Sequence, residues 1–500
     1  MKRPTTFAIV AALVVGGLLP GCAAGPNYKR PPITAPEQIR GLEGPAAALQ
    51  PGAAPPQAAP PEAGSLADRA WWEIFQEDNL KALIDEALRN GYDVRLAAWR
   101  VEEARANAGI ARSEFFPQIQ ADGGWTRGRQ SGFASPVTTP VNLYDVNLGL
   151  TWEIDLWGRI RRLNEAALSR YLATEEARRG VLLSLVSDVA TAYFRLRELD
   201  LQLEIARRTT TAFQETHALF SRRFEAGAAS ALETSSAAAS LATTSATIPD
   251  LERQIEAQEN LLGFLLGRNP GAISRGAGLN DQILPPDVPA GLPSELLERR
   301  PDLRQAEQEL VAANADVGVT VADFFPTISL TGAFGGVAPQ VSNLFGQGRT
   351  WSAGGGFLTP LFQGRRLKNQ HRAAIARWEQ AKTQYEQSVT NAFSEVSTAL
   401  VAYQTLADVE KEQARAVDSY REAVRLSNSR YLGGLSDYLE VLQAQQQLFP
   451  AENSLAQTRF DRLATLVQLY KALGGGWKLS GQDWSRPETR AAAAAPAALR

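Results

Sequence analysis

Few side chains in this sequence have the chemistry of a catalytic or metal-binding centre. The 500 residues include one cysteine and two histidines, His217 and His371. His217 continues the apolar spacing of a long helical segment, which predicts a packed interior histidine, and His371 begins a helical run that reads as exposed. The sequence has no HExxH pair, no phosphate-binding glycine loop and no nucleophile elbow. Because metal-dependent and covalent catalysis lack candidate residues, we expect no enzyme activity, no metal site and no cofactor.

The single cysteine, Cys22, stands at the end of an export signal. Lys2-Arg3 form a basic start, the stretch from Phe7 to Leu19 is apolar but short for a bilayer span, and Leu19-Pro20-Gly21-Cys22 ends it. The segment resembles a bacterial lipoprotein signal, in which cleavage leaves Cys22 as an acylated first residue. An ordinary secretory signal with an incidental cysteine is the alternative. Either signal exports the chain, which has no second cysteine for an internal disulfide. The residue after the cysteine is Ala23 and not an acidic residue. In this respect the signal resembles those of lipoproteins that are sorted to the outer membrane and not retained at the inner one.

Composition changes towards both ends of the chain. Residues 31–64 are dominated by proline, alanine and glycine and predict an extended leader, and the segment after Trp477 predicts a disordered tail. Roughly 410 residues lie between them, more than one compact core normally supports. The formal net charge is −3, or about −5 once Lys2 and Arg3 are removed, and there is no basic patch, so we expect no nucleic-acid partner.

The region between the ends contains an internal repeat. Residues 93–117, from Asp93 to Phe115-Phe116-Pro117, return at 302–326, from Asp302 to Phe324-Phe325-Pro326, at an offset of 209. Arg223-Phe224, Gly227 and Leu232-Glu233 return as Arg430-Tyr431, Gly434 and Leu439-Glu440 at an offset of 207. Ordered matches at nearly one spacing indicate a duplicated unit of structure. We therefore expect a signal peptide at 1–21, an acylated N-terminus and leader at 22–70, a first repeat at 71–270, a second repeat at 271–477 and a disordered tail at 478–500.

Each repeat contains long helical segments. No proline interrupts the chain from Arg162 to Ala226, which predicts one helix of ~64 residues. Apolar residues in it advance by three and four positions, the spacing of a coiled-coil seam: Leu182, Leu185, Val189, Ala192, Leu196, Leu199 and Leu203. The same spacing runs from Leu439 to Tyr470, with the polar Gln446 and Asn453 on the seam, and Pro249 and Pro450 should each kink or thin their helix. Residues 225–230 and 432–437 have turn chemistry and predict tight helical hairpins.

Each repeat also contains a pair of predicted strands. Apolar and polar residues alternate from Pro117 to Trp125 and from 146 to 155, and again from 327 to 334 and from Trp351 to Leu361. A period of two over ~9–11 residues is typical of transmembrane barrel strands, although a half-buried strand of a soluble sheet has the same pattern. Four strands cannot close a spanning barrel, because an open edge in lipid leaves backbone groups unpaired. If these strands span a membrane, several chains must share one barrel.

Several motifs in order along the chain resemble one family. They are Trp152-Glu153-Ile154-Asp155-Leu156-Trp157-Gly158-Arg159, the paired Phe-Phe-Pro turns, the segment from Leu292 to Asp302, and Leu469-Tyr470-Lys471-Ala472-Leu473-Gly474-Gly475-Gly476-Trp477. The chain resembles the outer-membrane factors of tripartite efflux pumps, the TolC family, nearest its OprM-like, NodT-type lipoprotein branch. The resemblance runs from about Cys22 to Trp477, nearly the whole mature chain.

The resemblance implies a fold, partners and a function. The fold is mainly α with a membrane β-barrel: an α-helical barrel of long coiled-coil helices continuous with a 12-stranded β-barrel shared by three chains, with an internal two-fold repeat in each. The partners are a periplasmic adaptor (membrane fusion protein), an inner-membrane pump of the RND type and outer-membrane lipid. The implied function is a passive exit duct for drugs or other small toxic molecules, located in the outer membrane, lipid-anchored, with a long periplasmic portion.

The resemblance also implies a periplasmic gate at the hairpin tips. In this family an acidic residue of the first hairpin pairs with a tyrosine and an arginine of the second, and acidic rings narrow the pore. Carried over, the acid resembles Glu233 and the tyrosine Tyr431, while Ser436 departs from the arginine. Leu439 resembles a constricting apolar residue and Glu440 an acidic ring position. Gln443 and Gln446 stand where the family commonly has charged residues, so we expect a gate held by hydrogen bonds and packing, with weak dependence on pH and salt.

Two other interpretations fit part of the pattern. The exit duct of a type I protein secretion system would use the same tube with a different pump, although the lipoprotein signal and the OprM-like motifs favour efflux. A periplasmic coiled-coil scaffold or adaptor without a pore would explain the helices. Four alternating strands at the ends of long helices, found twice, argue against it.

Overall fold

The computed structural model describes residues 23–33, 66–129, 139–282, 296–479 and 483–486, and its contacts divide the chain into two units. The first unit contains residues 1–33, 100–175 and 305–386, and the second contains residues 34–99, 176–304 and 387–500. Cys22, most of the predicted leader and the end of the predicted tail lie outside the described residues.

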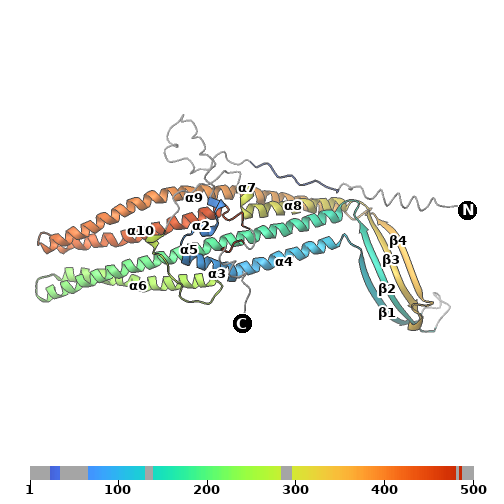
Figure 1. Cartoon of the computed structure of the whole chain (residues 1–500), viewed down its shortest axis with the longest axis horizontal. Helices are drawn as coiled ribbons and strands as arrows, with labels where there is room; N and C mark the ends of the chain where they lie inside the picture. Colours follow the sequence, from blue (N-terminus) through green and yellow to red (C-terminus); the bar gives the residue numbers. More distant parts are fainter. Residues whose placement is uncertain (1–22, 34–65, 130–138, 283–295, 480–482, 487–500) are drawn as a thin grey trace, which may run out of the picture. The chain divides into compact units, whose positions relative to one another are not determined.

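Three pairs of helices have equal lengths in the two halves of the sequence (Figure 1). Helices α4 (Tyr92–Ser113) and α8 (Pro301–Ala322) each have 22 residues. Helices α5 (Arg159–Glu225) and α9 (Arg366–Leu432) each have 67, and α6 (Ala231–Leu265) and α10 (Tyr438–Ala472) each have 35. The predicted helix at 162–226 is therefore confirmed within three residues, and α6 and α10 continue through Pro249 and Pro450.

The first unit contains one four-stranded antiparallel sheet in the order β1-β2-β3-β4. The strands are β1 (Gln118–Gly128), β2 (Val141–Ile154), β3 (Thr327–Ala338) and β4 (Arg349–Leu358). We expected the last strand to reach Leu361, but Pro360 has no N–H group for a ladder hydrogen bond and β4 ends before it. Strands β1 and β4 form the two edges, and all their residues are exposed.

The segment 23–30, here called the N-terminal strap, packs against α5 and α8 of the same unit. Its backbone is fixed at Ala24, whose N–H donates to the Trp157 carbonyl at 2.8 Å. At the other end of the strap, Arg30 forms an ion pair with Glu307 and donates to both of its carboxylate oxygens, at 2.6 and 2.5 Å. Polar contacts therefore hold the strap from its first residues to its last.

The second unit contains the main hydrophobic core. Helices α2 (Trp71–Ile74) and α3 (Asp78–Asn90) pack against the middle of α5 and the ends of α6 and α10. The predicted seam of α5 is buried from Leu182 to Leu199, with Leu203 partly buried. A neighbouring face of α5 is also buried, at Leu183, Val186, Ala190 and Phe194. The remaining short helices are η2 (Leu66–Asp68), η3 (Leu279–Asp281), η5 (Val341–Asn343) and α7 (Leu296–Arg299).

The structure corrects both predicted ends of the folded region. Leu66 and Ala67, which we placed in the leader, are buried in the core. Trp484, which we placed in the disordered tail, is 3% exposed and its carbonyl accepts a hydrogen bond from Trp71 Nε1 at 2.8 Å. Arg486 forms an ion pair at 2.5 Å with the buried Asp85. Composition did not indicate that these segments are folded, because a few large or charged residues are enough to anchor a segment that is otherwise poor in apolar side chains.

The two histidines differ from the predicted picture. His217 is only partly buried, whereas Phe213 and Phe220, on either side of it along α5, are buried. His371 is also partly buried, with its Nδ1 atom 3.0 Å from Thr320 Oγ1 and its ring edge-on to Phe324. The expectation that His371 is exposed was therefore wrong.

Candidate functional site

The predicted gate residues lie at the tips of two helical hairpins in the second unit, α5–α6 and α9–α10 (Figure 1). Each turn contains one glycine in the left-handed region, Gly227 at φ 73° and Gly434 at φ 71°. A side chain with a Cβ atom is strained there, and glycine is not. Helices α5 and α9 are thus each followed by a turn with a glycine in the left-handed conformation, and the two glycines are 207 residues apart.

An aromatic cluster packs the two hairpins together below the turns. Phe220 of α5 lies against Tyr438 of α10, with ring centroids 4.2 Å apart, and Tyr431 of α9 packs edge-on to Tyr438 at 5.6 Å. Phe213, Ala237, Val441 and Leu442 complete this buried cluster. Apolar packing therefore contributes to the contact between the first and second hairpins close to their tips.

The predicted pairing of Glu233 with Tyr431 is not seen among the described residues. Glu233 instead accepts hydrogen bonds from the Ser230 N–H at 2.7 Å and the Ser230 hydroxyl at 2.8 Å, while Ser230 caps α6 in return. Tyr431 accepts a hydrogen bond from Arg223, whose guanidinium also lies over the Tyr431 ring. Glu233 is the third residue of α6, so the local capping box captures its carboxylate.

The electrostatics of the tip follow from these contacts. Hydrogen bonds from the Ser230 backbone and hydroxyl, together with the nearby Arg223 charge, lower the pKa of Glu233. Glu440 forms an ion pair with Arg430 at 3.4 Å, and both side chains are about half exposed. Pairs of this exposed kind contribute at most about 1 kcal/mol, so the ionic contacts of the tip are weak.

The other predicted tip residues have few partners within the described chain. Leu439 is 54% exposed, and Gln443 is exposed. Gln446 makes one long contact of 3.4 Å to the Ser240 hydroxyl. The Ser436 hydroxyl is buried without a hydrogen bond. Of the seven predicted residues, the structure brings only Tyr431 into the aromatic cluster.

Sequence reasoning missed several contacts at the hairpin tips and between the two hairpins. Arg223 belongs to the repeated block, but nothing in the sequence assigned it to Tyr431. Ser230 and Glu233 fit the spacing of a capping box, which is a readable signal. Further from the tip, Glu452 of α10 is 4% exposed and pairs with Arg208 of α5 at 2.5 Å and Arg421 of α9 at 2.8 Å.

A partly buried cluster of charges lies between α9 and α10. Glu410 of α9 accepts hydrogen bonds from Arg459, at 3.1 Å, and from Arg462 of α10. Burial alone would raise the pKa of Glu410, but the hydrogen bonds and charges of the two arginines outweigh it and lower the pKa. The second hairpin is therefore held together by ionic contacts as well as by its seam.

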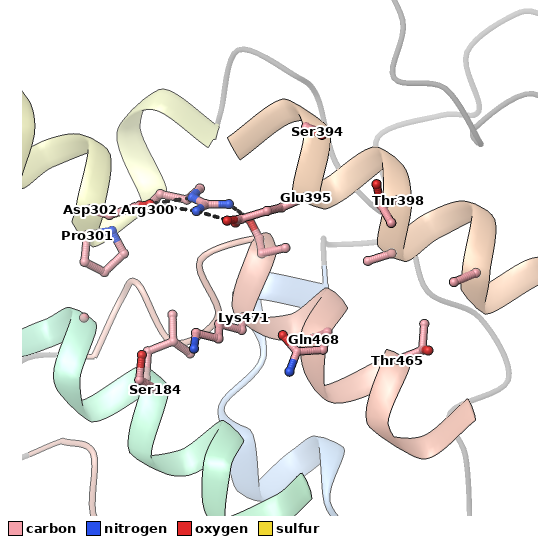
Figure 2. A pocket seen from close by; sticks show the side chains of 15 residues that line it. Ser184, Arg300, Pro301, Asp302, Ser394, Glu395, Thr398, Thr465, Gln468 and Lys471 are labelled. Atoms are coloured by element: carbon pink, nitrogen blue, oxygen red, sulfur yellow. Dashed lines mark hydrogen bonds and ion pairs between the residues drawn. The ribbon is translucent and has the colours of Figure 1, made fainter. Parts of the chain in front are cut away.

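A cavity of about 640 Å³ in the second unit lies where α5, α9 and α10 meet. Figure 2 shows Arg300 on its wall, joined to Asp302 and Glu395, with Gln468 and Lys471 along α10. Its charged lining residues are two cations and two carboxylates, so the lining has no net formal charge. Arg300 also donates to the Ala472 carbonyl at 2.9 Å, which indicates a structural role at the end of α10.

Among the described residues, no group of three or more histidine, cysteine, aspartate or glutamate side chains is arranged to hold a metal ion. Within the same ranges, no helix has both the length and the apolar character needed to cross a membrane.

The architecture of long helical hairpins joined to a four-stranded sheet defines a class of proteins. The family model described as "Outer membrane efflux protein" matches residues 83–268 and 292–475. The chain belongs to the outer membrane efflux protein family, which confirms the resemblance that its motifs indicated.

Individual relatives agree with this assignment. "Solvent efflux pump outer membrane protein SrpC" of Pseudomonas putida is 36% identical over 467 residues, covering 93% of this chain and 97% of the relative. "Probable outer membrane lipoprotein SilC" of Salmonella typhimurium is 32% identical, covering 92% and 97%. Among solved structures, the open state of the MtrE outer membrane channel of Neisseria gonorrhoeae has a TM-score of 0.80 at 29% identity, covering 91% of this chain and 99% of that one.

Membership of this family determines the general role of the protein. It is an outer-membrane channel protein of efflux, and its role is transport rather than catalysis. A periplasmic scaffold without a pore is excluded by the same findings.

Proposed function

We propose that three copies of this chain form one exit duct, with a 12-stranded β-barrel in the outer membrane and a tube of long helices below it. The observation that carries this proposal is the four-stranded sheet, whose edge strands β1 and β4 have no neighbour beyond them in the described chain and are exposed throughout. Unpaired backbone groups are costly in lipid, and a closed barrel removes both edges. The number three comes from the family.

The proposed duct is built from two repeats per chain, at residues 71–270 and 271–477. The equal lengths of α4 and α8, of α5 and α9, and of α6 and α10 support this division. The two segments matched by the family model, 83–268 and 292–475, also support it. Duplication of this kind places six similar units around a three-chain tube.

The duct works with a periplasmic adaptor and an inner-membrane pump of the RND type, which supplies the energy. The substrates are drugs or other small toxic molecules, in keeping with relatives named for solvent and antibiotic efflux. A type I secretion duct would use the same tube, but relatives named for solvent and antibiotic efflux favour an efflux duct.

Cys22 is proposed to carry the acyl anchor. The likeness to SilC, named an outer membrane lipoprotein, supports this role. Mass spectrometry of the mature N-terminal peptide should show a diacylglyceryl group and a fatty amide on Cys22. An unmodified N-terminus at another residue would refute the acylation.

The hairpin tips are proposed to form the periplasmic gate. Glu233, Tyr431, Ser436, Leu439, Glu440, Gln443 and Gln446 are its residues, with Leu439 and Glu440 narrowing the pore. Packing around Tyr431 and the weak ionic contacts of the tip support a gate held mainly without charge pairs. The double variant Gln443→Asp, Gln446→Arg should introduce a charged pair and make conductance more dependent on salt and pH. Equally steep dependence in the parent protein would refute the uncharged gate.

The experiment that tests the duct is single-channel recording with purified protein in planar bilayers. We expect discrete openings from a trimer, and restoration of solvent or drug tolerance when the gene is returned to a host that lacks its own outer-membrane efflux component. A detergent-extracted particle that behaves as a single subunit and gives no discrete openings would refute the proposal.

A further inference from the structure

The internal repeat specifies how the edges of two copies should meet. In the chain, Gln118 of β1 lies opposite Thr151 of β2, and Thr327 of β3 lies opposite Leu358 of β4. Gln118 and Thr327 differ by 209 positions, and Thr151 and Leu358 differ by 207. The β1–β2 pair thus has the same register as the β3–β4 pair once these two offsets are applied.

The helices that follow the strands keep the same offsets. Helix α5 begins at Arg159 and α9 at Arg366, a difference of 207. The backbone agrees at the residue before each helix, because Gly158 has φ 79° and Arg365 has φ 68°. Arg365 is the one non-glycine residue with positive φ in the described ranges. The equivalence of the two halves therefore holds for the backbone as well as for the sequence.

The pair β2–β3 is the junction between the two halves inside one chain, and Thr151 lies opposite Thr331 in it. The equivalent junction between two copies joins β4 of one to β1 of the next. Thr151 of β2 corresponds to Leu358 of β4, which lies 207 positions later in the chain. Thr331 of β3 corresponds to Asp122 of β1, which lies 209 positions earlier. We infer that β4 of one copy pairs antiparallel with β1 of the next, with Leu358 opposite Asp122 of the neighbouring copy. This register rests on the proposed shared barrel and makes it specific.

The two faces of the sheet provide an independent check. Paired residues in the chain share a face, so Trp125, Tyr144, Phe334 and Trp351 lie on one side, which carries most of the large apolar residues. On β1 and β4 the residues of this side have odd numbers. The inferred register joins odd positions of β4 to odd positions of β1, so the apolar face continues across the junction. A slip of one residue would place apolar residues beside polar ones along the whole junction.

Side-chain size is also compatible with this register. Gly355 falls opposite Trp125 of the next copy, and Phe357 falls opposite Gly123. Each large ring therefore faces a residue without a side chain, which leaves room for it above the sheet.

Disulfide trapping tests the register, because Cys22 is the only natural cysteine. The variant Gly128→Cys, Ser352→Cys places two thiols directly opposite each other across the junction, and Arg127→Cys, Ala353→Cys does so on the other face. Directly opposite residues have Cβ atoms about 5 Å apart, while residues two positions off are about 7 Å apart and beyond the reach of a disulfide. Oxidation in isolated outer membranes should convert both variants to a reducible covalent trimer. Each single-cysteine variant should stay monomeric on denaturing gels.

Matched controls separate failure of the register from failure of the barrel. Thr126→Cys, Ser352→Cys and Gly128→Cys, Gly354→Cys test slips of two residues in each direction. Cross-linked trimers from either control, with none from the inferred pairs, would overturn the register and leave the shared barrel standing. No cross-linking between chains in any of the four pairs, with discrete openings still recorded, would overturn the register alone. A particle that behaves as a single subunit and gives no discrete openings would overturn both.

Discussion

The buried carboxylate of Glu452 should control how firmly the two hairpins are joined. Glu452 of α10 accepts hydrogen bonds from Arg421 of α9, at 3.1 Å from Nε and 2.8 Å from Nη2, and from Arg208 of α5 at 2.5 Å. It is therefore a bridge from the second hairpin to the first. The substitution Glu452→Gln keeps the shape of the side chain and removes its charge.

The size of the effect follows from the burial of the three groups. Hydrogen bonds to a charged group contribute about 1.5–3 kcal/mol each, and the Glu452 side chain is 4% exposed. The Arg208 and Arg421 side chains are 55% and 54% exposed, so water replaces much of what they lose. We therefore expect a loss of about 2 kcal/mol, far below the sum for three such bonds. This corresponds to roughly a 30-fold increase in the population of locally opened hairpin.

Hydrogen exchange measured by mass spectrometry on the detergent-purified protein can detect this change. Peptides of α10 around residue 452 and of α5 around residue 208 should exchange about 30-fold faster in Glu452→Gln. The matched control is Glu422→Gln, which removes an exposed pair with Arg425 and should change exchange less than about threefold. Equal effects of the two substitutions, or an effect of Glu452→Gln restricted to α9, would refute the bridge.

Three further predictions concern the core, the second hairpin and the tip. Trp484→Ala should lower the stability of the second unit by about 3 kcal/mol, because Trp484 is buried in its core, and a lower thermal midpoint by circular dichroism would show it. The lowered pKa of Glu410 means that its stabilising contribution is complete above the unfolded-state value near pH ~4.3 and is lost as the pH falls through the folded-state value. Glu410→Gln should therefore lower the thermal midpoint at pH 7, and a difference from the parent that did not shrink as the pH fell below the unfolded-state value would contradict this. Gly434→Ala should destabilise the tip by about 1–2 kcal/mol through its positive φ, whereas Gly433→Ala should not, and exchange rates of the turn amides compare them.

Regular patterns in the sequence predicted the elements of the fold. The long helix and its seam were found because apolar residues keep a spacing of three and four over many turns, which a strand or a loop does not do. The strands were found from their alternation, and the repeat from ordered matches at nearly one offset. These signals are distributed over tens of residues, so single exceptions such as Gln446 did not hide them.

Contacts made by single residues were not predictable in the same way. The carboxylate of Glu233 had two possible partners, the Tyr431 hydroxyl in space and the Ser230 cap in sequence, and the nearby cap prevailed because it needs no tertiary arrangement. The anchoring of Trp484 has no periodic signal, because one buried ring and one ion pair fix the segment. The sequence alone also gave no reason to expect that Glu452 bridges three helices.

The contacts between the two hairpins change in kind from the tip towards the core. At the tip they are exposed and polar, as in the hydrogen bond from Arg223 to Tyr431, followed by the aromatic cluster around Tyr438 and a long amide contact from Gln446. Glu452 is then a buried charged bridge, and beyond it the hairpins merge into the main core. Local opening requires the least free energy where contacts are exposed and few, so it should begin at the tips and be stopped at the level of Glu452. If the gate lies at the tips, the segment between Tyr431 and Glu452 is the part that can move without disturbing the core.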